Sequence, residues 1–79
     1  MEIYKDIDND SGVASFEIDD DSITVKFKEA NKLGHTTYKY SNRKAGTNNI
    51  EQMKKLAILG DGLNAFINKN VRKEYDSRW

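Results

Sequence analysis

The chain has 79 residues, with 13 basic and 13 acidic side chains and neither cysteine nor proline. This length predicts a single domain over residues 1–79. Without cysteine, neither disulfides nor thiolate–zinc sites can stabilise it, so its stability must come from packing. No apolar run approaches the about 20 residues of a membrane span, and the acidic N-terminus lacks the apolar region of a signal peptide. We therefore expect a cytoplasmic protein without membrane contacts.

The first half of the chain predicts an antiparallel meander, and its two clearest strands come first. Residues 13–19 alternate weakly, with Ala14, Phe16 and Ile18 on the apolar face, and residues 23–27 alternate cleanly. The acidic and serine side chains between them are typical of a hairpin turn, because such side chains bond to their own backbone.

A third strand is predicted over 35–41, after a longer connection over 29–34, and residues 3–4 are a candidate edge strand. Tyr38 and Tyr40 share one face of the third strand. Matching that face to the apolar face of the second strand turns both tyrosines toward the core. The opposite face of these three strands carries lysines but no aromatic side chain on which a nucleobase could stack.

The hydrophobic period then changes to that of helices. Asn48, followed three residues later by Glu51, predicts a capping box, and Gly60 predicts the end of this helix at a positive φ. Asp61 is predicted to cap a second helix, whose apolar stripe continues to Tyr75. The predicted fold is therefore α+β, an antiparallel meander of three or four strands followed by two helices packed on one face of the sheet. The predicted core consists of Phe16, Ile23, Val25, Phe27, Tyr38, Tyr40, Ile50, Met53, Leu56, Ala57, Leu63, Phe66, Ile67 and Val71.

A stretch near the N-terminus has the acidic spacing of a calcium-binding loop. Asp6, Asp8 and Asp10 occupy its first, third and fifth positions, and Glu17 occupies its twelfth. Ser11 stands where the loop requires glycine, and the flanking segments predict a strand rather than two helices. We therefore expect an acidic loop without a metal site.

Charge is divided unevenly along the chain. The first 40 residues hold nine acids and five lysines, whereas the remaining residues hold eight bases and four acids. If the two predicted helices are adjacent, their basic side chains would converge into a strip able to contact phosphates. A solvated helix surface is the simpler interpretation, because strong nucleic-acid binders usually carry net positive charge. The candidate nucleic-acid-binding residues are Arg43, Lys44, Lys54, Lys55, Lys69, Arg72 and Lys73.

The chain carries no recognisable catalytic motif. His35 is the only histidine. The chain has no cysteine nucleophile, and the sequence shows no pattern that would place His35 in a Ser-His-acid catalytic triad. Gly60-Asp61-Gly62 lacks the spacing and the Lys-Ser/Thr pair of a P-loop, and it lies between predicted helices. We therefore expect no enzyme activity, no cofactor and no small-molecule substrate.

Several short motifs occur in an order that resembles a known family. They are Ser11-Gly12-Val13, Val25-x-Phe27, Tyr38-Lys39-Tyr40, the glycines Gly60 and Gly62, and the pair Val71-Arg72. Over residues 11–75 the chain resembles the small KTSC domain, which is named for the C-terminus of some lysyl-tRNA synthetases and also occurs as a stand-alone bacterial protein. The resemblance implies the α+β fold, makes Tyr38 and Tyr40 the family motif, and suggests RNA as a ligand.

These observations favour a small non-enzymatic binding module for RNA or another polyanion. The alternative is an accessory domain that docks to a protein partner through its helices or an open sheet edge, and a calcium-binding module is the third hypothesis. Salt-dependent association with RNA would distinguish the first hypothesis from the second.

Overall fold

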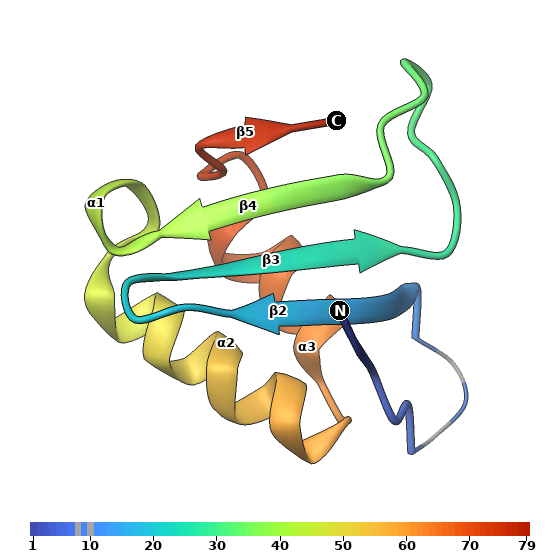
Figure 1. Ribbon diagram of the computed structural model, residues 1–79, viewed down its shortest axis with the longest axis horizontal. Coiled ribbons are helices and arrows are strands. Elements are labelled where there is room, and N and C mark those ends of the chain that lie inside the picture. Colours follow the sequence, from blue (N-terminus) through green and yellow to red (C-terminus); the bar gives the residue numbers. More distant parts are fainter. Residues whose placement is uncertain (8, 10) are drawn as a thin grey trace.

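Five antiparallel strands form one sheet, and the helices lie in the chain between its fourth and fifth strands (Figure 1). The computed structural model describes residues 1–7, 9 and 11–79. The strands, whose order in the sheet is their order in the chain, are β1 (Glu2–Ile3), β2 (Val13–Ile18), β3 (Ser22–Phe27), β4 (Thr37–Ser41) and β5 (Ser77–Arg78). Between β4 and β5 the chain forms α1 (Asn42–Ala45), α2 (Thr47–Leu59), α3 (Leu63–Phe66) and the π-helix η1 (Ile67–Val71).

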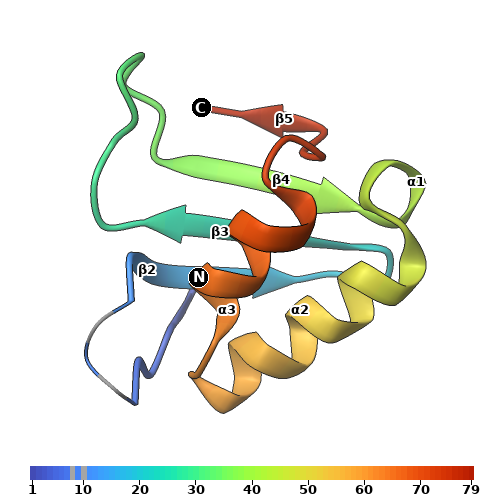
Figure 2. The same ribbon diagram turned by 180° about the vertical axis from the view of Figure 1, so that it is seen from behind.

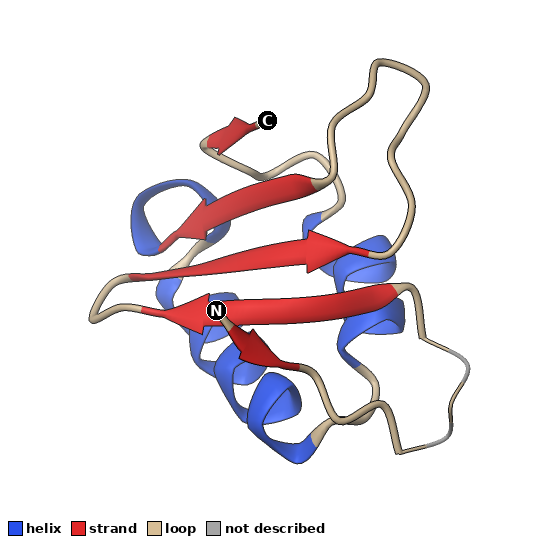
Figure 3. Cartoon of the chain, turned by 45° about the vertical axis from the view of Figure 1, so that its right-hand side comes forward, coloured by secondary structure: helices blue, strands red, loops and turns tan. Residues whose placement is uncertain are grey.

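The predicted α+β architecture is confirmed, and the structure adds a fifth strand after the helices. Figures 2 and 3 show α2, α3 and η1 on one face of the sheet, with α1 as a single turn at the end of β4. No described helix covers the other face of the sheet, which we call the free face. Within the described part of the chain, no helix is both long and apolar enough to cross a membrane.

The β2–β3 hairpin forms where the sequence predicts it, but with a shift in register. A bulge between Val13 and Ser15 interrupts the pairing. An extra residue in one strand reverses the alternation on either side of it, so Val13 and Phe16 are both buried. Ala14 is only half-buried, and Ile18 is 36% exposed next to the turn, so the predicted apolar face of this strand is corrected at both residues.

The third strand begins at Thr37 rather than at residue 35. The Asn31 side-chain Oδ1 accepts hydrogen bonds from the backbone N–H groups of Leu33 and His35, both at 2.9 Å. These bonds hold residues 31–35 as a loop, because an Asx side chain offers the backbone an alternative to strand pairing.

The first long helix ends as predicted but begins differently. Its N-cap is Gly46, with no side-chain cap, so the predicted Asn48–Glu51 capping box is wrong. The backbone of Gly46 at φ 94° leads out of α1 directly into α2, which brings Asn48 inside the helix. Gly60 is confirmed as the residue that ends this helix at a positive φ, here 76°, and its N–H donates to the Leu56 carbonyl at 2.9 Å.

The second helical segment is shorter than predicted, and its second half is a π-helix rather than an α-helix. Its N-cap is Gly62 in the left-handed region, so the predicted Asp61 cap is wrong. From Ile67 to Val71 the helix has π geometry, which often marks functional sites. The helix ends there, and Tyr75 lies outside it, in the segment that returns to the sheet.

The predicted core is confirmed at most positions. Ten of its members are buried, and Phe27, Tyr38, Leu56 and Phe66 pack against them while half-exposed. Sequence reasoning missed Tyr4, whose buried hydroxyl accepts a hydrogen bond from the Leu63 backbone N–H at 3.3 Å. The core thereby joins the segment after β1 to the start of α3.

Candidate ligand-binding pocket

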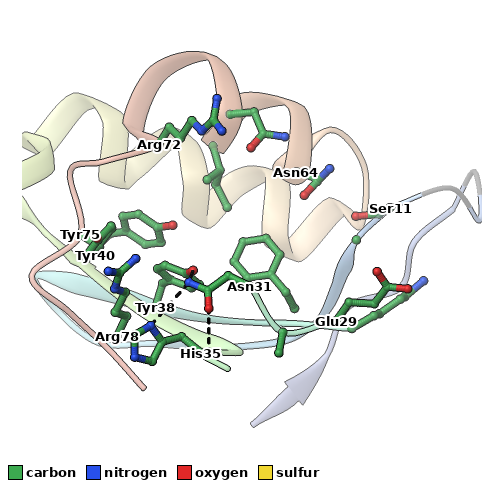
Figure 4. A pocket seen from close by; sticks show the side chains of 16 residues that line it. Ser11, Glu29, Asn31, His35, Tyr38, Tyr40, Asn64, Arg72, Tyr75 and Arg78 are labelled. Atoms are coloured by element: carbon green, nitrogen blue, oxygen red, sulfur yellow. Dashed lines mark hydrogen bonds between the residues drawn. The ribbon is translucent and has the colours of Figure 1, made fainter. Parts of the chain in front are cut away.

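A pocket of about 670 Å³ lies between the helix-covered face of the sheet and the second helical segment (Figure 4). This volume is in the range of ordinary small-ligand sites. Its lining comes from the β3–β4 connection, from β4, from α3 and η1, and from the C-terminal segment that includes β5.

Aromatic rings form one side of the pocket. The Tyr38 ring meets the Phe27 ring at 5.5 Å and the Tyr75 ring at 5.2 Å, both edge to face, and it stacks with Tyr40 at 6.5 Å. Burial raises the pKa of the Tyr40 hydroxyl far above its usual range, and repulsion from Tyr38 and Tyr75 raises that pKa further. Tyr40 is therefore a neutral hydroxyl at physiological pH and cannot serve as a base.

Asn31 fixes the loop side of the pocket. Its Nδ2 donates to the Tyr38 hydroxyl at 2.8 Å and lies 3.5 Å from His35 Nδ1, while its Oδ1 holds the loop backbone (Figure 4). One amide therefore orients both the histidine and the tyrosine. His35 lies in this loop, two residues before the strand in which the sequence placed it.

Two arginines supply positive charge. Arg72 follows η1 on the helical side of the pocket, and Arg78 belongs to β5 on the sheet side. The Arg78 guanidinium carbon lies 5.1 Å from the centroid of the Tyr75 ring, a cation–π contact that orients it. Among the described residues neither arginine has an ion-pair partner, whereas Lys28, which also lines the pocket, pairs with Asp6 at 2.9 Å. The two guanidinium groups are therefore available to an anion.

Two amides line the helical wall beside them. Asn64 and Asn68 lie four residues apart, and Arg72 follows four residues later, so all three share one side of the helical segment. Within the part of the chain that is described, neither amide side chain makes a hydrogen bond, unlike Asn70, whose Nδ2 donates to the Phe66 carbonyl at 3.2 Å. The wall thus presents donors and acceptors next to the positive charge.

The seven basic residues of the predicted strip lie on three elements. Arg43 and Lys44 are on α1, Lys54 and Lys55 are on α2, and Lys69, Arg72 and Lys73 are on η1 and just after it. Lys54 is engaged, since its Nζ donates to the Asp20 carbonyl at 2.9 Å and lies 3.4 Å from Glu51. Only Arg72 of the seven lines the pocket.

Sequence reasoning missed Arg78 and Asn31 as pocket residues. Arg78 enters the site because a two-residue strand pairs it with Tyr38, and so short a strand has no periodic pattern. The spacing of Arg78 three residues after Tyr75 was the one available signal, but it is unspecific.

The acidic loop contributes no site in the described structure. Asp8 and Asp10, two of the predicted calcium ligands, lie outside the described residues. Asp6 Oδ1 accepts the Ser11 N–H at 3.1 Å and its Oδ2 pairs with Lys28, while Glu17 lies on β2, exposed to solvent. Within the described residues no group of three or more His, Cys, Asp or Glu could hold a metal ion.

Comparison with known proteins gave no match among protein-family models, curated proteins or solved structures. The KTSC resemblance therefore stays a prediction from the sequence motifs.

Proposed function

We propose that this chain is a small non-enzymatic module that binds a polyanion, with RNA as the leading ligand, and that Arg72 and Arg78 hold a phosphate in the pocket. The observation that carries the proposal is the pair of guanidinium groups without acidic partners among the described residues, on opposite sides of one pocket. A guanidinium group binds phosphate through two parallel hydrogen bonds, and such charge-assisted bonds are about twice as strong as neutral ones.

The charge of the pocket lining supports an anionic ligand. Lys28, Arg72 and Arg78 line it, and Glu29 is the one acidic side chain among its described lining residues. The free amides of Asn64 and Asn68 would add hydrogen bonds to phosphate or sugar oxygens.

The chemistry of the pocket favours binding over catalysis. Tyr40 stays protonated, and the amide of Asn31 restrains His35 and Tyr38 together. These groups hold the shape of the pocket and offer hydrogen bonds to a ligand, and a Tyr40 hydroxyl that keeps its proton cannot act as a general base. A cytoplasmic location and KTSC membership both agree with an RNA ligand and form part of the proposal.

The test is the affinity for a short single-stranded RNA pool, measured by fluorescence anisotropy at several salt concentrations. We expect log K to fall with log salt at a slope of about −0.7 per phosphate contacted. The double variant Arg72→Gln/Arg78→Gln should bind at least about 10-fold more weakly, because it loses two charge-assisted contacts.

The matched control is Arg43→Gln/Lys44→Gln, which removes the same charge from α1, outside the pocket lining. Equal losses in both double variants would indicate unspecific attraction and would contradict the pocket as the site. If the protein bound no RNA at low salt, the proposal of an RNA ligand would be contradicted and the protein-interaction alternative would be favoured. Thermal unfolding of each variant checks that the fold is intact.

A further inference from the structure

Strand β5 and the residue that follows it present two different side chains to the two faces of the sheet. Arg78 pairs with Tyr38, whose ring lies on the helix-covered face, and so Arg78 reaches the pocket. Trp79 comes directly after it and pairs with Thr37 through two backbone hydrogen bonds, Thr37 N–H to Trp79 O at 3.0 Å and Trp79 N–H to Thr37 O at 2.9 Å. Because successive side chains alternate, Trp79 stands on the free face.

The pairing of all five strands sets the neighbours of Trp79. One row crosses the free face from edge to edge, because each residue in it is paired with the next: Ile3, Ser15, Lys26, Thr37 and Trp79. Lys26 is two strands from Trp79, at about 10 Å by the usual strand spacing. Lys39 lies on the same face of β4, paired with Thr24. The sequence predicted a free face without an aromatic side chain from three strands alone, and the structure corrects this, because Trp79 after β5 adds one.

Trp79 is well placed to receive a planar group. Trp79 is 57% exposed on a face that no described helix covers, and the register places Lys39 of β4 and Lys26 of β3 on the same face. Glu17 also lies on this face, farther away on β2, where it pairs with Thr24. The aspartates of the β2–β3 turn share a hollow with Lys39, but they lie beyond Ser41, at the other end of β4 from Thr37 and Trp79. Proteins that bind single-stranded nucleic acids combine positive charge, which attracts the backbone, with exposed aromatic rings. Every base has a flat face that can stack on such a ring.

We infer that the ligand is a single-stranded nucleic acid that crosses the β5 edge, with one base stacked on Trp79 and a backbone phosphate held at Arg72 and Arg78 on the other side. This inference rests on the proposed function and narrows it from a polyanion to a strand with unpaired bases. β5 is the last strand of the sheet, so a flexible chain can pass around it. A duplex has its bases stacked internally and cannot offer one to Trp79 without unpairing it.

The experiment uses the intrinsic fluorescence of Trp79, the only tryptophan in the chain. The protein is titrated with deca-uridine, with base-free polyphosphate of matched charge, and with an RNA duplex. We expect deca-uridine to quench the emission saturably. Polyphosphate should bind, as shown by its competition with labelled deca-uridine, but leave the emission unchanged, and the duplex should quench far less than the single strand.

Variants separate the base contact from the phosphate contact. Trp79→Ala should weaken deca-uridine binding roughly 5- to 150-fold, as for other base–aromatic stacks, and leave polyphosphate binding unchanged. Trp79→Phe should retain part of the affinity, because it keeps a ring. The matched control is Ile3→Ala, which removes a side chain that is 78% exposed at the far end of the same row.

Three outcomes would overturn this inference. Deca-uridine binding without quenching, or at full affinity in Trp79→Ala, would show that no base stacks there, while the arginine-dependent binding of the proposed function would still stand. Loss of affinity in Trp79→Ala with none in Arg72→Gln/Arg78→Gln would show that the strand does not cross the edge, and it would also remove the proposed phosphate site.

Discussion

The ring of Tyr75 meets the ring of Tyr38 edge to face, with 5.2 Å between centroids and 75° between planes. Tyr75 follows the helical segment and Tyr38 lies on β4, so this contact closes the C-terminal segment onto the sheet. It also brings the Arg78 guanidinium over Tyr75 and into the pocket. The aromatic pair thus connects the core to the candidate site.

We first predict that the core depends on α2 through its buried side. Ile50→Ala should lower the free energy of unfolding by about 2–5 kcal/mol, because Ile50 is fully buried and truncation leaves a cavity. Ile58→Ala, on the same helix but 59% exposed, should change it by less than about 0.5 kcal/mol. Urea unfolding measures both, and similar losses in the two variants would contradict the assigned helix face.

A second prediction concerns the turn after α2. Gly60→Ala should destabilise the protein by more than about 1 kcal/mol, since its φ of 76° is strained for alanine and the added Cβ would come within 2.5 Å of the Lys5 Cβ. Gly34→Ala is the control, because Gly34 has a φ of 89° with no atom within 4 Å of an added Cβ, and it should show the backbone strain alone. Thermal unfolding should rank Gly60→Ala as the more harmful change, and the reverse order would contradict the close approach of the segment after β1.

The Asn31 amide gives a third prediction. Asn31→Ala removes an acceptor for two backbone N–H groups and the donor to the Tyr38 hydroxyl, and it should cost about 1–3 kcal/mol. Asn31→Asp keeps the acceptor and should cost less. The amide NMR signals of Leu33 and His35 should move strongly in the alanine variant and weakly in the aspartate variant. Equal effects would show that the side-chain acceptor does not hold the loop.

The fourth prediction is that burial of the Tyr40 hydroxyl makes the free energy of unfolding fall at alkaline pH. Its folded-state pKa is raised by burial above the about 10 of an unfolded tyrosine, so the unfolded chain releases this proton first. The stabilisation is complete below pH 10 and declines as pH rises above it, because deprotonation then favours unfolding. Urea unfolding between pH 7 and 11.5 should show a steeper alkaline decline in the unchanged protein than in Tyr40→Phe. Parallel curves would contradict the assigned burial of the hydroxyl.

The elements that the sequence predicted well are those whose pattern is local. The alternation of Ile23 and Val25 and the helical spacing of Ile50 and Met53 each predict a buried face, and all four side chains are fully buried. The start of α2 was misplaced, because the backbone of Gly46 caps it and no side chain does.

The candidate site was harder to predict, because residues distant in sequence build it. The sequence predicts Arg72 as one of seven basic residues and does not distinguish it from Lys69 or Lys73. In the structure the helix ends after its π turn, and Arg72 is the one of these three that lines the pocket. Arg78 and Trp79 depend on pairing with β4, a contact across the whole helical region that two or three residues cannot signal. The positions of Arg78 and Trp79 are therefore set by tertiary strand pairing.

The shortness of β5 has a consequence for how the protein would respond to a ligand. Apart from the pairing of Ser77 and Arg78 with β4, four backbone hydrogen bonds join this segment to the sheet among the described residues. Their donors are the N–H groups of Asp76, Trp79, Thr36 and Thr37. Segments with so few bonds open locally at a small fraction of the global free energy, and their amide hydrogens exchange quickly with solvent. Opening would withdraw Arg78 and Trp79 together, so a ligand that holds both must slow exchange at residues 76–79 while leaving the β2–β3 hairpin unchanged.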